Sequence, residues 1–341
     1  SERLRQATAL FQLGTGYGID DDVCAIYRLL CQNYEEGDRI CLFGFSRGAY
    51  TVRIVAALIR MVGLLAPDRD NLTEQLLAAY KVIGARDGNA PVEDFEAVSL
   101  FRKFAETRPA TIHFLGLFDT VASVIVPGRN FFGLLPGTSS LPYTRTNTSV
   151  RAIRHAVAID ERRVMFRANL WAEGQAFVPN PFAAEETNPT QDCKQLLFAG
   201  VHADVGGGYP EKQSGLAKLS LEWMIDEARV HDIKFVEGRV KRFVMGQRRY
   251  ETDRFVVPDP AACLHRSLKG FWWLLEAVPK RRATVEPWET WLMRWYMPFG
   301  ERRLLEDRGK ALEVHRSVGE RIAAVPGYSP PNIPNLQGVD P

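Results

Sequence analysis

The pattern with the clearest chemical meaning in this chain is Gly-Phe-Ser-Arg-Gly at residues 44–48, which sets Ser46 between two glycines. Residues 40–45 form a short, continuously apolar run, which is typical of a strand buried on both faces. Residues 49–63 carry aliphatic side chains at helical spacing. A serine at so sharp a turn from strand to helix is forced outward, where its hydroxyl can attack a carbonyl carbon. The pattern predicts a nucleophile elbow for acyl transfer.

A serine hydroxyl is a weak nucleophile unless a base takes its proton and a third group orients that base. Asp119 follows an apolar run at 111–118, and His202 follows another at 195–201. The chain order serine, acid, histidine, with each residue at the end of a strand, is that of hydrolases built around this turn. No other histidine of the chain follows a predicted strand in this way. Ser46, Asp119 and His202 are therefore predicted to form a catalytic triad.

Each of these assignments has a structural alternative. Asp119 could cap a turn, and His202 could only hydrogen-bond a loop. Gly206 and Gly207 lie in a glycine run after His202 and could mark a tight turn. Asp204 is either a hydrogen-bonding partner within that loop or one arm of a His-x-Asp metal pair. The sequence shows no further cluster of metal ligands, so neither a metal nor a cofactor is predicted.

The oxyanion formed in acyl transfer needs hydrogen-bond donors. The backbone N–H of Arg47 is predicted to be one, because the turn aims the start of the helix at the serine. Gly44 and Gly48 are predicted to let the strand and the helix approach closely. A second donor is expected from a loop after an early strand. The residues before Gly14 are too few for that strand, so the chain is expected to begin partway into the fold, with the second donor unassigned.

The elements around these residues predict an α/β fold with a mostly parallel sheet. Buried strand patterns alternate with helical patterns, which we expect at 20–34, 49–63, 73–83, 149–159 and 216–230. We divide the chain into an α/β-hydrolase core at 1–230, a helical cap or insertion at 231–311, and a C-terminal helix with a proline-rich tail at 312–341.

The composition of the chain argues against several classes of protein. Hydrophobic residues make up 46% of the chain and charged residues 25%, which is ordinary for a globular protein. A net charge of +2 does not favour nucleic acid as a partner. No apolar run is long enough to cross a bilayer. The five cysteines are scattered and contain no Cys-x-x-Cys, so a disulfide framework is not expected.

An aromatic segment within 231–311 has two interpretations. Trp288, Trp291 and Trp295 recur on one face of a predicted helix, among arginines and lysines. The helix could meet anionic lipid, since tryptophan and cationic residues suit the headgroup region. It could instead pack its aromatic face on the hydrolase core, and this interpretation is favoured because most such stripes are core.

Several runs of the sequence form a recognisable set: Gly-Phe-Ser-Arg-Gly-Ala-Tyr at 44–50, Gly-Leu-Phe-Asp-Thr-Val at 116–121, Gly-Val-His-Ala-Asp-Val-Gly-Gly-Gly-Tyr at 200–209, and residues 33–40, 155–163, 264–268 and 314–318. Together they resemble the α/β-hydrolase domain of type VI secretion phospholipase effectors. The resemblance extends from about residue 14 to 334 and implies a triad of Ser46, Asp119 and His202 that acts on membrane phospholipids or other lipid esters. Members of that family usually open with a strand and a Cys-Asp-Gly-Thr-Trp-like turn, which is missing here.

The favoured hypothesis is a serine hydrolase that cleaves lipid or phospholipid acyl esters and contacts a membrane surface transiently. The first alternative is a cytosolic esterase for small soluble esters. The second is a catalytically silent binding or toxin-assembly module of the same fold. As an effector, the protein would meet a secretion apparatus or an immunity protein, and would leave the cytoplasm without a cleaved signal peptide.

Overall fold

The computed structural model describes residues 18–84, 101–121, 125–127, 136–138, 141–163, 166, 168–179, 188–269, 273, 280–281, 295–296 and 312–330. Within these ranges, no helix combines the length and the apolar character that a membrane span requires. All five cysteines are described, and all carry free thiols. The segment before Gly14, on which the prediction about the first strand depends, lies outside the described residues.

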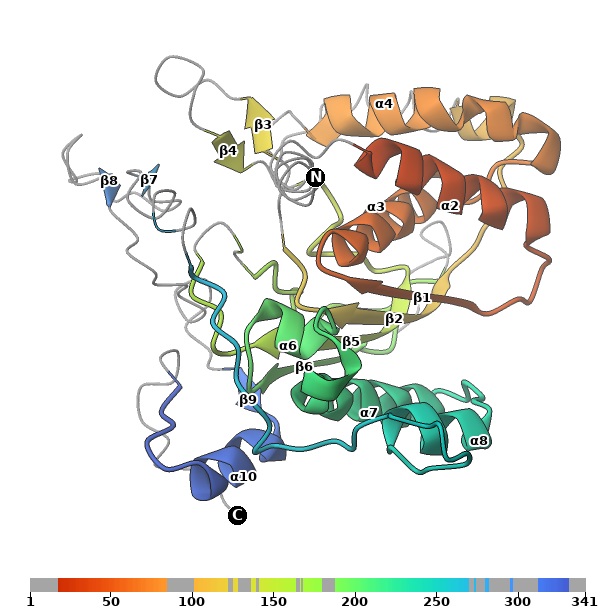
Figure 1. Cartoon of the computed structure of the whole chain (residues 1–341). Helices are drawn as coiled ribbons and strands as arrows, with labels where there is room; N and C mark the ends of the chain where they lie inside the picture. The colour runs from red at the N-terminus through yellow and green to blue at the C-terminus, as the bar shows by residue number, and fades with distance from the viewer. Residues whose placement is uncertain are drawn as a thin grey trace, which may run out of the picture. The chain divides into compact units, whose positions relative to one another are not determined.

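The central element is a five-stranded parallel sheet in the order β1-β2-β5-β6-β9 (Figure 1). β1 and β2 run parallel, with Ile40 opposite Ile112 and Phe45 opposite Phe118. β6 and β9 also run parallel, with Leu197 opposite Val314. The prediction of an α/β fold with a mostly parallel sheet flanked by helices is therefore confirmed. The strands span Ile40–Phe45, Ile112–Phe118, Val150–Ala158, Asp192–Phe198 and Glu313–Val314.

The chain forms two compact units that interleave along the sequence. The first comprises residues 1–155 and 169–195, and the second comprises 156–168 and 196–341. β5 and β6 each contribute residues to both units.

Three α-helices pack together in the first unit (Figure 1). These helices are α2 (Ile19–Asn33), α3 (Arg47–Val62) and α4 (Thr73–Gly84). Most of the side chains of α3 are buried, so this helix lies within the hydrophobic core of the unit. The hydroxyl of Tyr27 on α2 donates to the carbonyl of Gly63, 2.7 Å away, which ties α2 to the end of α3.

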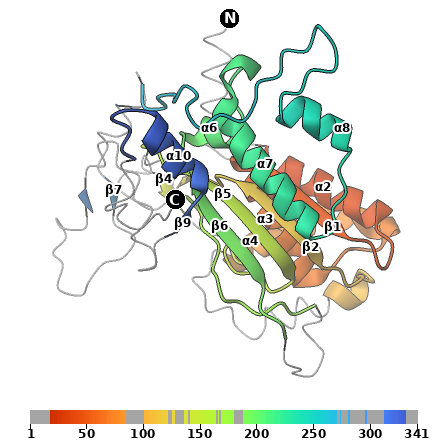
Figure 2. The same ribbon diagram turned by 90° about the horizontal axis from the view of Figure 1, so that it is seen from below.

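The second unit contains the helices that follow β6. α6 (His202–Gly206) is a short helix, and α7 (Gly215–Val230) follows it along the chain (Figure 2). α7 packs on β6 through Trp223, whose ring centroid lies 5.4 Å from that of Phe198. The other helices that the structure describes in this unit are the 3-10 helix η3 (Glu211–Gln213), α8 (Glu237–Arg239), the π-helix η4 (Val240–Val244) and α10 (Arg316–Ala324).

The helices predicted at 20–34, 49–63, 73–83 and 216–230 are confirmed, but the helix predicted at 149–159 is wrong. Those residues form β5, a strand between β2 and β6. All residues of β5 except Arg151 are buried, so its side chains lack the alternation of buried and exposed residues that identifies a half-buried strand, and periodicity does not separate it from a helix. Its charged side chain Arg154 is buried and pairs with Asp192, with Nη2 2.8 Å from Oδ2.

The strand predicted at 195–201 is displaced by three residues, because β6 ends at Phe198. His202 therefore does not follow the strand directly. It is instead the first residue of α6, after a turn in which Gly200 adopts a φ of 124°.

Candidate active site

Ser46 occupies the sharp turn between β1 and α3. Its backbone has φ 56° and ψ −122°, a conformation that a non-glycine residue adopts only under constraint from its surroundings. The Ser46 N–H donates to the carbonyl of Phe118 at 3.0 Å, and the Ser46 carbonyl accepts from the N–H of Tyr50 at 3.3 Å. The turn is thus fixed on one side to the end of β2 and on the other to the first turn of α3.

Gly44 and Gly48, the two glycines of the motif, differ in the space around them. A Cβ added at Gly44 would lie 2.6 Å from the backbone N and Cα of Ala49 and from the carbonyl oxygen of Gly48. A Cβ added at Gly48 would meet nothing within 4 Å. Close approach of strand and helix therefore requires glycine at 44, as predicted, whereas the same prediction for Gly48 is wrong.

Arg47 is the first residue of α3. Its backbone N–H is among the four at a helix start that have no acceptor within the helix, and it lies at the positive end of the helix dipole. Its side chain reaches toward α2, where Nη2 is 3.7 Å from Oδ2 of Asp22.

Asp119 directly follows β2 and is fully buried, with a φ of 36°. The next residue, Thr120, holds this turn through three hydrogen bonds. Its N–H donates to Nε2 of His155 at 3.2 Å, and its carbonyl accepts from the N–H of Asn169 at 2.9 Å. Its hydroxyl accepts from Nη2 of Arg53 at 3.1 Å. The backbone that carries Asp119 is therefore fixed by groups from α3, from β5 and from the chain at 169.

His155 is a structural histidine on β5. Because its Nε2 accepts from Thr120, its Nδ1 carries the proton and donates to Oε1 of Gln195, 3.3 Å away. The same amide oxygen accepts from the N–H of Trp171 at 2.7 Å. The sequence does not predict this chain of contacts, because its pattern places His155 in a helix rather than on the strand beside β2.

Arg53 is a fully buried cation on α3. Its Nη1 donates to the carbonyl of Thr144 at 3.1 Å, and its guanidinium lies 5.4 Å from the ring centroid of Trp171. Burial lowers the pKa of Arg53 to about 9, since a desolvated cation is less stable. Its hydrogen bond to Thr120 makes it a support of the Asp119 turn.

His202 belongs to the second unit and is 5% exposed. Its backbone N–H donates to Oε2 of Glu161 at 3.2 Å. The ring of Phe166 meets the imidazole edge-on, with centroids 4.9 Å apart. The imidazole of His202 therefore packs against an aromatic ring, and the backbone of His202 is held by the carboxylate of Glu161.

Glu161 anchors several segments of the second unit, a role that the sequence pattern does not predict. Its carboxylate is fully buried and accepts at least six hydrogen bonds. The donors are the N–H groups of Arg162, Arg163 and His202, the Nε and Nη2 of Arg163, and the hydroxyl of Ser267. Glu161 lies in the family-like run 155–163, which was the signal that could have identified it.

Asp204 is the second anchor of the His202 loop. Its Oδ2 accepts from the N–H groups of Val201 and His265, at 3.1 and 3.2 Å, and its Oδ1 lies 2.6 Å from Nδ1 of His265. The ring of His265 stacks on Tyr209, with centroids 3.5 Å apart, and its Nε2 lies 3.1 Å from Oε1 of Gln213. The sequence allows two interpretations of Asp204, a hydrogen-bonding partner within the loop or one arm of a metal pair. The contacts of its carboxylate are those of the hydrogen-bonding partner.

The glycines near His202 shape the same loop. A Cβ on Gly200 would lie 2.5 Å from Cβ of Asp204, so only glycine allows that carboxylate to close over the turn. Gly206 is the last residue of α6, and Gly207 ends the helix in the left-handed region with a φ of 79°. Among the residues that the structure describes, no group of three or more His, Cys, Asp or Glu side chains is arranged to hold a metal ion.

The aromatic segment is described only in part. Trp288 and Trp291 lie outside the described residues. Trp295 and Tyr296 form the short strand β8, which pairs antiparallel with β7 (Lys280–Arg281). Trp295 therefore does not belong to the helix that is predicted to run through this stripe, because its backbone pairs with β7.

The structure thus places a constrained serine turn and a buried aspartate turn at the carboxyl ends of two paired strands, β1 and β2, within an α/β fold. Residues 1–227, about two thirds of the chain, match the family model for the catalytic domain of type VI secretion (T6SS) Tle1-like phospholipase effectors. The chain belongs to this family.

One relative and two solved structures are similar to this chain over part of their length. An uncharacterized protein of Saccharomyces cerevisiae is 32% identical over 181 residues, which cover 52% of this chain and 25% of the relative. A crystal structure of an uncharacterized protein from Pseudomonas aeruginosa has 23% identity and a TM-score of 0.31, covering 62% of this chain and 26% of that one. A structure of the Tle1 effector bound to the VgrG spike has 21% identity and a TM-score of 0.26, and the match covers 57% of this chain and 31% of that one. The chain spans about a quarter of the length of the yeast relative.

Proposed function

We propose that this protein is a serine hydrolase that cleaves the acyl esters of phospholipids, with Ser46 as nucleophile, His202 as base and Asp119 as the acid that supports the base. Membership in a family of phospholipase effector catalytic domains suggests lipid ester hydrolysis. The observation that carries the proposal for the site is the backbone of Ser46. A serine kept at a positive φ between a strand and a helix is the mark of a nucleophile elbow.

The proposed reaction follows from the groups at these positions. Oγ of Ser46 forms a bond to the ester carbonyl carbon while His202 takes the hydroxyl proton. The carbonyl oxygen becomes an oxyanion, which the N–H of Arg47 would stabilise, and Asp119 would stabilise the imidazolium. Collapse breaks the bond to the alcohol, which leaves with the proton from His202. Water then attacks the acyl carbon while His202 takes its proton. The second collapse breaks the bond to Oγ of Ser46, which receives that proton from His202 as the fatty acid leaves.

The surroundings of the two partner residues support these roles. Asp119 is fully buried, and Thr120 fixes its turn, as a residue that orients a base requires. His202 lies against Phe166, and Glu161 anchors its backbone. An imidazole held in this way has few rotamers available, which reduces the entropy lost on reaching the reactive geometry.

The proposed protein partner is a component of a secretion apparatus, because the family is one of type VI secretion effectors. The Tle1 effector has been solved bound to the VgrG spike, so a spike protein is the first component to test. We propose the membrane lipid of a target cell as substrate and an immunity protein as a further partner. Co-purification of the full chain with a spike protein from the same organism tests the first of these partners.

One set of assays tests the proposed chemistry. Wild type is compared with Ser46→Ala on short-chain esters, long-chain esters and phospholipid vesicles. We expect kcat on vesicles to fall by about 10⁴-fold or more. Ser214→Ala, which removes the hydroxyl of a serine between η3 and α7 (Ser214 Oγ to Tyr209 O, 3.1 Å), is the control and is expected to retain activity.

Each other outcome of these assays has a defined meaning. Turnover that persists in pure Ser46→Ala contradicts the assignment of the nucleophile. Turnover of short esters alone makes the protein an esterase for soluble substrates. Absence of turnover in the folded wild type makes it a binding or toxin-assembly module.

A further inference from the structure

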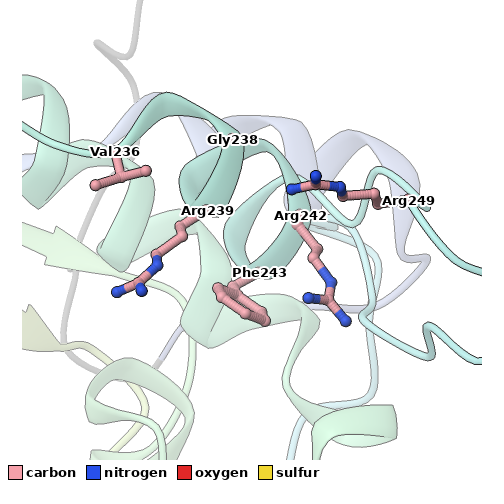
Figure 3. A pocket seen from close by; sticks show the side chains of 6 residues that line it. All are labelled: Val236, Gly238, Arg239, Arg242, Phe243 and Arg249. Atoms are coloured by element: carbon pink, nitrogen blue, oxygen red, sulfur yellow. The ribbon is translucent and has the colours of Figure 1, made fainter.

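A basic pocket lies in the second unit, where α8 and η4 are followed by a loop (Figure 3). Its volume is about 500 Å³. Three arginines and two apolar side chains line it, and the side chains of Arg239 and Arg242 lie on either side of the Phe243 ring. The lining residues are Val236, Gly238, Arg239, Arg242, Phe243 and Arg249.

The pocket carries an excess of positive charge. Between residues 236 and 249 five side chains are Arg or Lys and one, Glu237, is acidic. Glu237 is already neutralised, because its Oε1 accepts from Nη2 of Arg229 at 2.8 Å. Among the described residues, no carboxylate pairs with Arg239 or Arg249. Two guanidinium groups at the pocket therefore remain available to an anion.

A buried carboxylate keeps the pocket in shape. The side chain of Asp253 is 2% exposed and accepts from Nε of Arg242 at 3.0 Å. It also accepts from the N–H groups of Arg249 and Tyr250, at 2.9 and 3.1 Å. The loop that carries Arg249 is thus tied to η4, so the arginines are held together before any ligand binds, which lowers the entropy lost on binding.

Exposed apolar side chains surround the arginines. Val236 is 64% exposed, Tyr250 51% and Phe243 37%. Water-exposed aromatic and aliphatic side chains beside arginines are the composition of surfaces that enter the headgroup region of a membrane. Planar guanidinium groups match the geometry of phosphate oxygens.

We propose that this pocket binds the phosphate of an anionic phospholipid headgroup and holds the protein on an anionic lipid surface. The choice of a lipid as the source of the phosphate rests on the proposed function. A free phosphate ion would use the arginines but would leave Val236 and Tyr250 exposed to water. A lipid headgroup engages the charges and covers the apolar side chains together.

The test measures binding of the full chain to vesicles by flotation, with Ser46→Ala as background so that lipid is not hydrolysed. Vesicles contain phosphatidylcholine with or without phosphatidylglycerol. On that background, Arg239→Gln with Arg249→Gln is compared with Arg39→Gln plus Arg151→Gln, which removes the same charge from exposed positions in the first unit. We expect roughly fivefold weaker binding to phosphatidylglycerol vesicles per pocket arginine, and less than about twofold loss in the control pair.

A second variant tests the apolar part of the surface. Val236→Ser changes an exposed side chain, so the fold is expected to persist, and binding to phosphatidylglycerol vesicles is expected to weaken about threefold. Circular dichroism and thermal unfolding establish that each variant is folded.

Three outcomes overturn the proposal. The first is equal loss of binding in the pocket pair and in the control pair. The second is no preference of the parent protein for phosphatidylglycerol, and the third is displacement of the protein from vesicles by inorganic phosphate at sub-millimolar concentration, which indicates a soluble ligand.

Failure of the pocket is distinguishable from failure of the triad. In a Ser46-containing chain, the pocket pair should hydrolyse a soluble short-chain ester at the wild-type rate while hydrolysing vesicles more slowly. Equal rates on vesicles for this pair and the wild type overturn the pocket and leave the triad standing. Vesicle binding by a protein without turnover on any ester leaves the pocket standing and overturns the triad.

Discussion

Oδ1 of Asp204 lies 2.6 Å from Nδ1 of His265, and the two residues are 61 positions apart in the sequence. The same carboxylate accepts the N–H of Val201, the residue before His202. One buried side chain therefore joins the turn that carries His202 to a segment far along the chain. The conformation of the proposed base depends on a contact that the local sequence does not contain.

Asp204→Ala should destabilise the protein more than His265→Ala. The first change leaves the N–H groups of Val201 and His265 without their acceptor, at a cost of about 3 kcal/mol in the free energy of unfolding. The second leaves those two hydrogen bonds in place and should cost about 1 kcal/mol. Urea unfolding of both variants measures the difference. Equal losses would show that the imidazole, rather than the backbone donors, carries the stabilisation.

Gly44→Ala and Gly48→Ala form a matched pair on the serine turn. The added methyl at 44 would overlap the backbone of Ala49 at 2.6 Å, so the strand or the helix must move, and we expect a loss of about 3 kcal/mol in stability. The added methyl at 48 meets nothing within 4 Å and improves helix propensity, so stability should rise by up to about 1 kcal/mol. Thermal unfolding gives both values. A Gly48→Ala protein as unstable as Gly44→Ala contradicts this interpretation of the turn.

Thr120→Val should reduce kcat with little effect on KM. The change removes the hydroxyl that accepts from Arg53 and loosens the turn that carries Asp119, while the shape of the side chain is kept. A small displacement of a group that orients the base lowers the rate by about 10- to 100-fold. Thr120→Ser keeps the hydroxyl and should restore the rate. Steady-state kinetics on a soluble ester tests the pair, and equal rates for Val and Ser exclude Thr120 as a positioning residue.

Unfolding in acid should report on His315. Burial, with a smaller effect of Arg316, lowers the pKa of His315 to about 4 in the folded protein, while the unfolded chain has the usual value near 6.5. Between pH 6.5 and 4 the unfolded chain binds more protons than the folded protein does. The contribution of His315 to the free energy of unfolding is therefore fully present above pH 6.5 and is lost as the pH falls toward 4. The loss should be about 2 kcal/mol, since the side chain is only partly buried.

His315→Asn is the variant that isolates this effect. His315 is the N-cap of α10 and its Nδ1 accepts from the N–H of Ser317, a role that asparagine can fill without titrating. The variant loses the stacking of the imidazole on Phe198, so its stability at neutral pH should be lower. Its stability should depend less on pH between 6.5 and 4. An unchanged slope would assign the acid sensitivity to other groups.

The sequence predicted the elements whose patterns are local. β1 and α3 have apolar runs of different period on either side of Ser46, and Asp119 follows β2 as expected. The prediction of a helix at β5 is wrong, because a strand covered on both faces lacks the alternation that identifies an edge or a half-buried strand. The predicted end of β6 lies three residues late, because the apolar run continues past its last ladder residue into the turn at Gly200.

The supports of the candidate site were beyond prediction for a different reason. Glu161 and His265 act through long-range pairing, with Ser267 and with Asp204, and a single sequence carries no record of which distant side chains meet. Arg53, a fully buried cation, looks like any other basic residue on a helix until its neighbours are known. The sequence pattern predicts the residues of the proposed triad, but it does not predict the side chains that position them, such as Glu161 and Arg53.

The short strand β9 has a practical consequence for anyone who expresses part of this protein. The match to the family ends at residue 227, yet Glu313 and Val314 pair with Leu196 and Leu197 at the outer side of β6. A fragment cut at 227 would lack β9, so the backbone donors and acceptors of Leu196 and Leu197 that face it would be unpaired, and an unpaired strand edge recruits strands from neighbouring molecules. Such a fragment should form insoluble aggregates during purification, whereas a polypeptide that extends through α10 should remain dispersed.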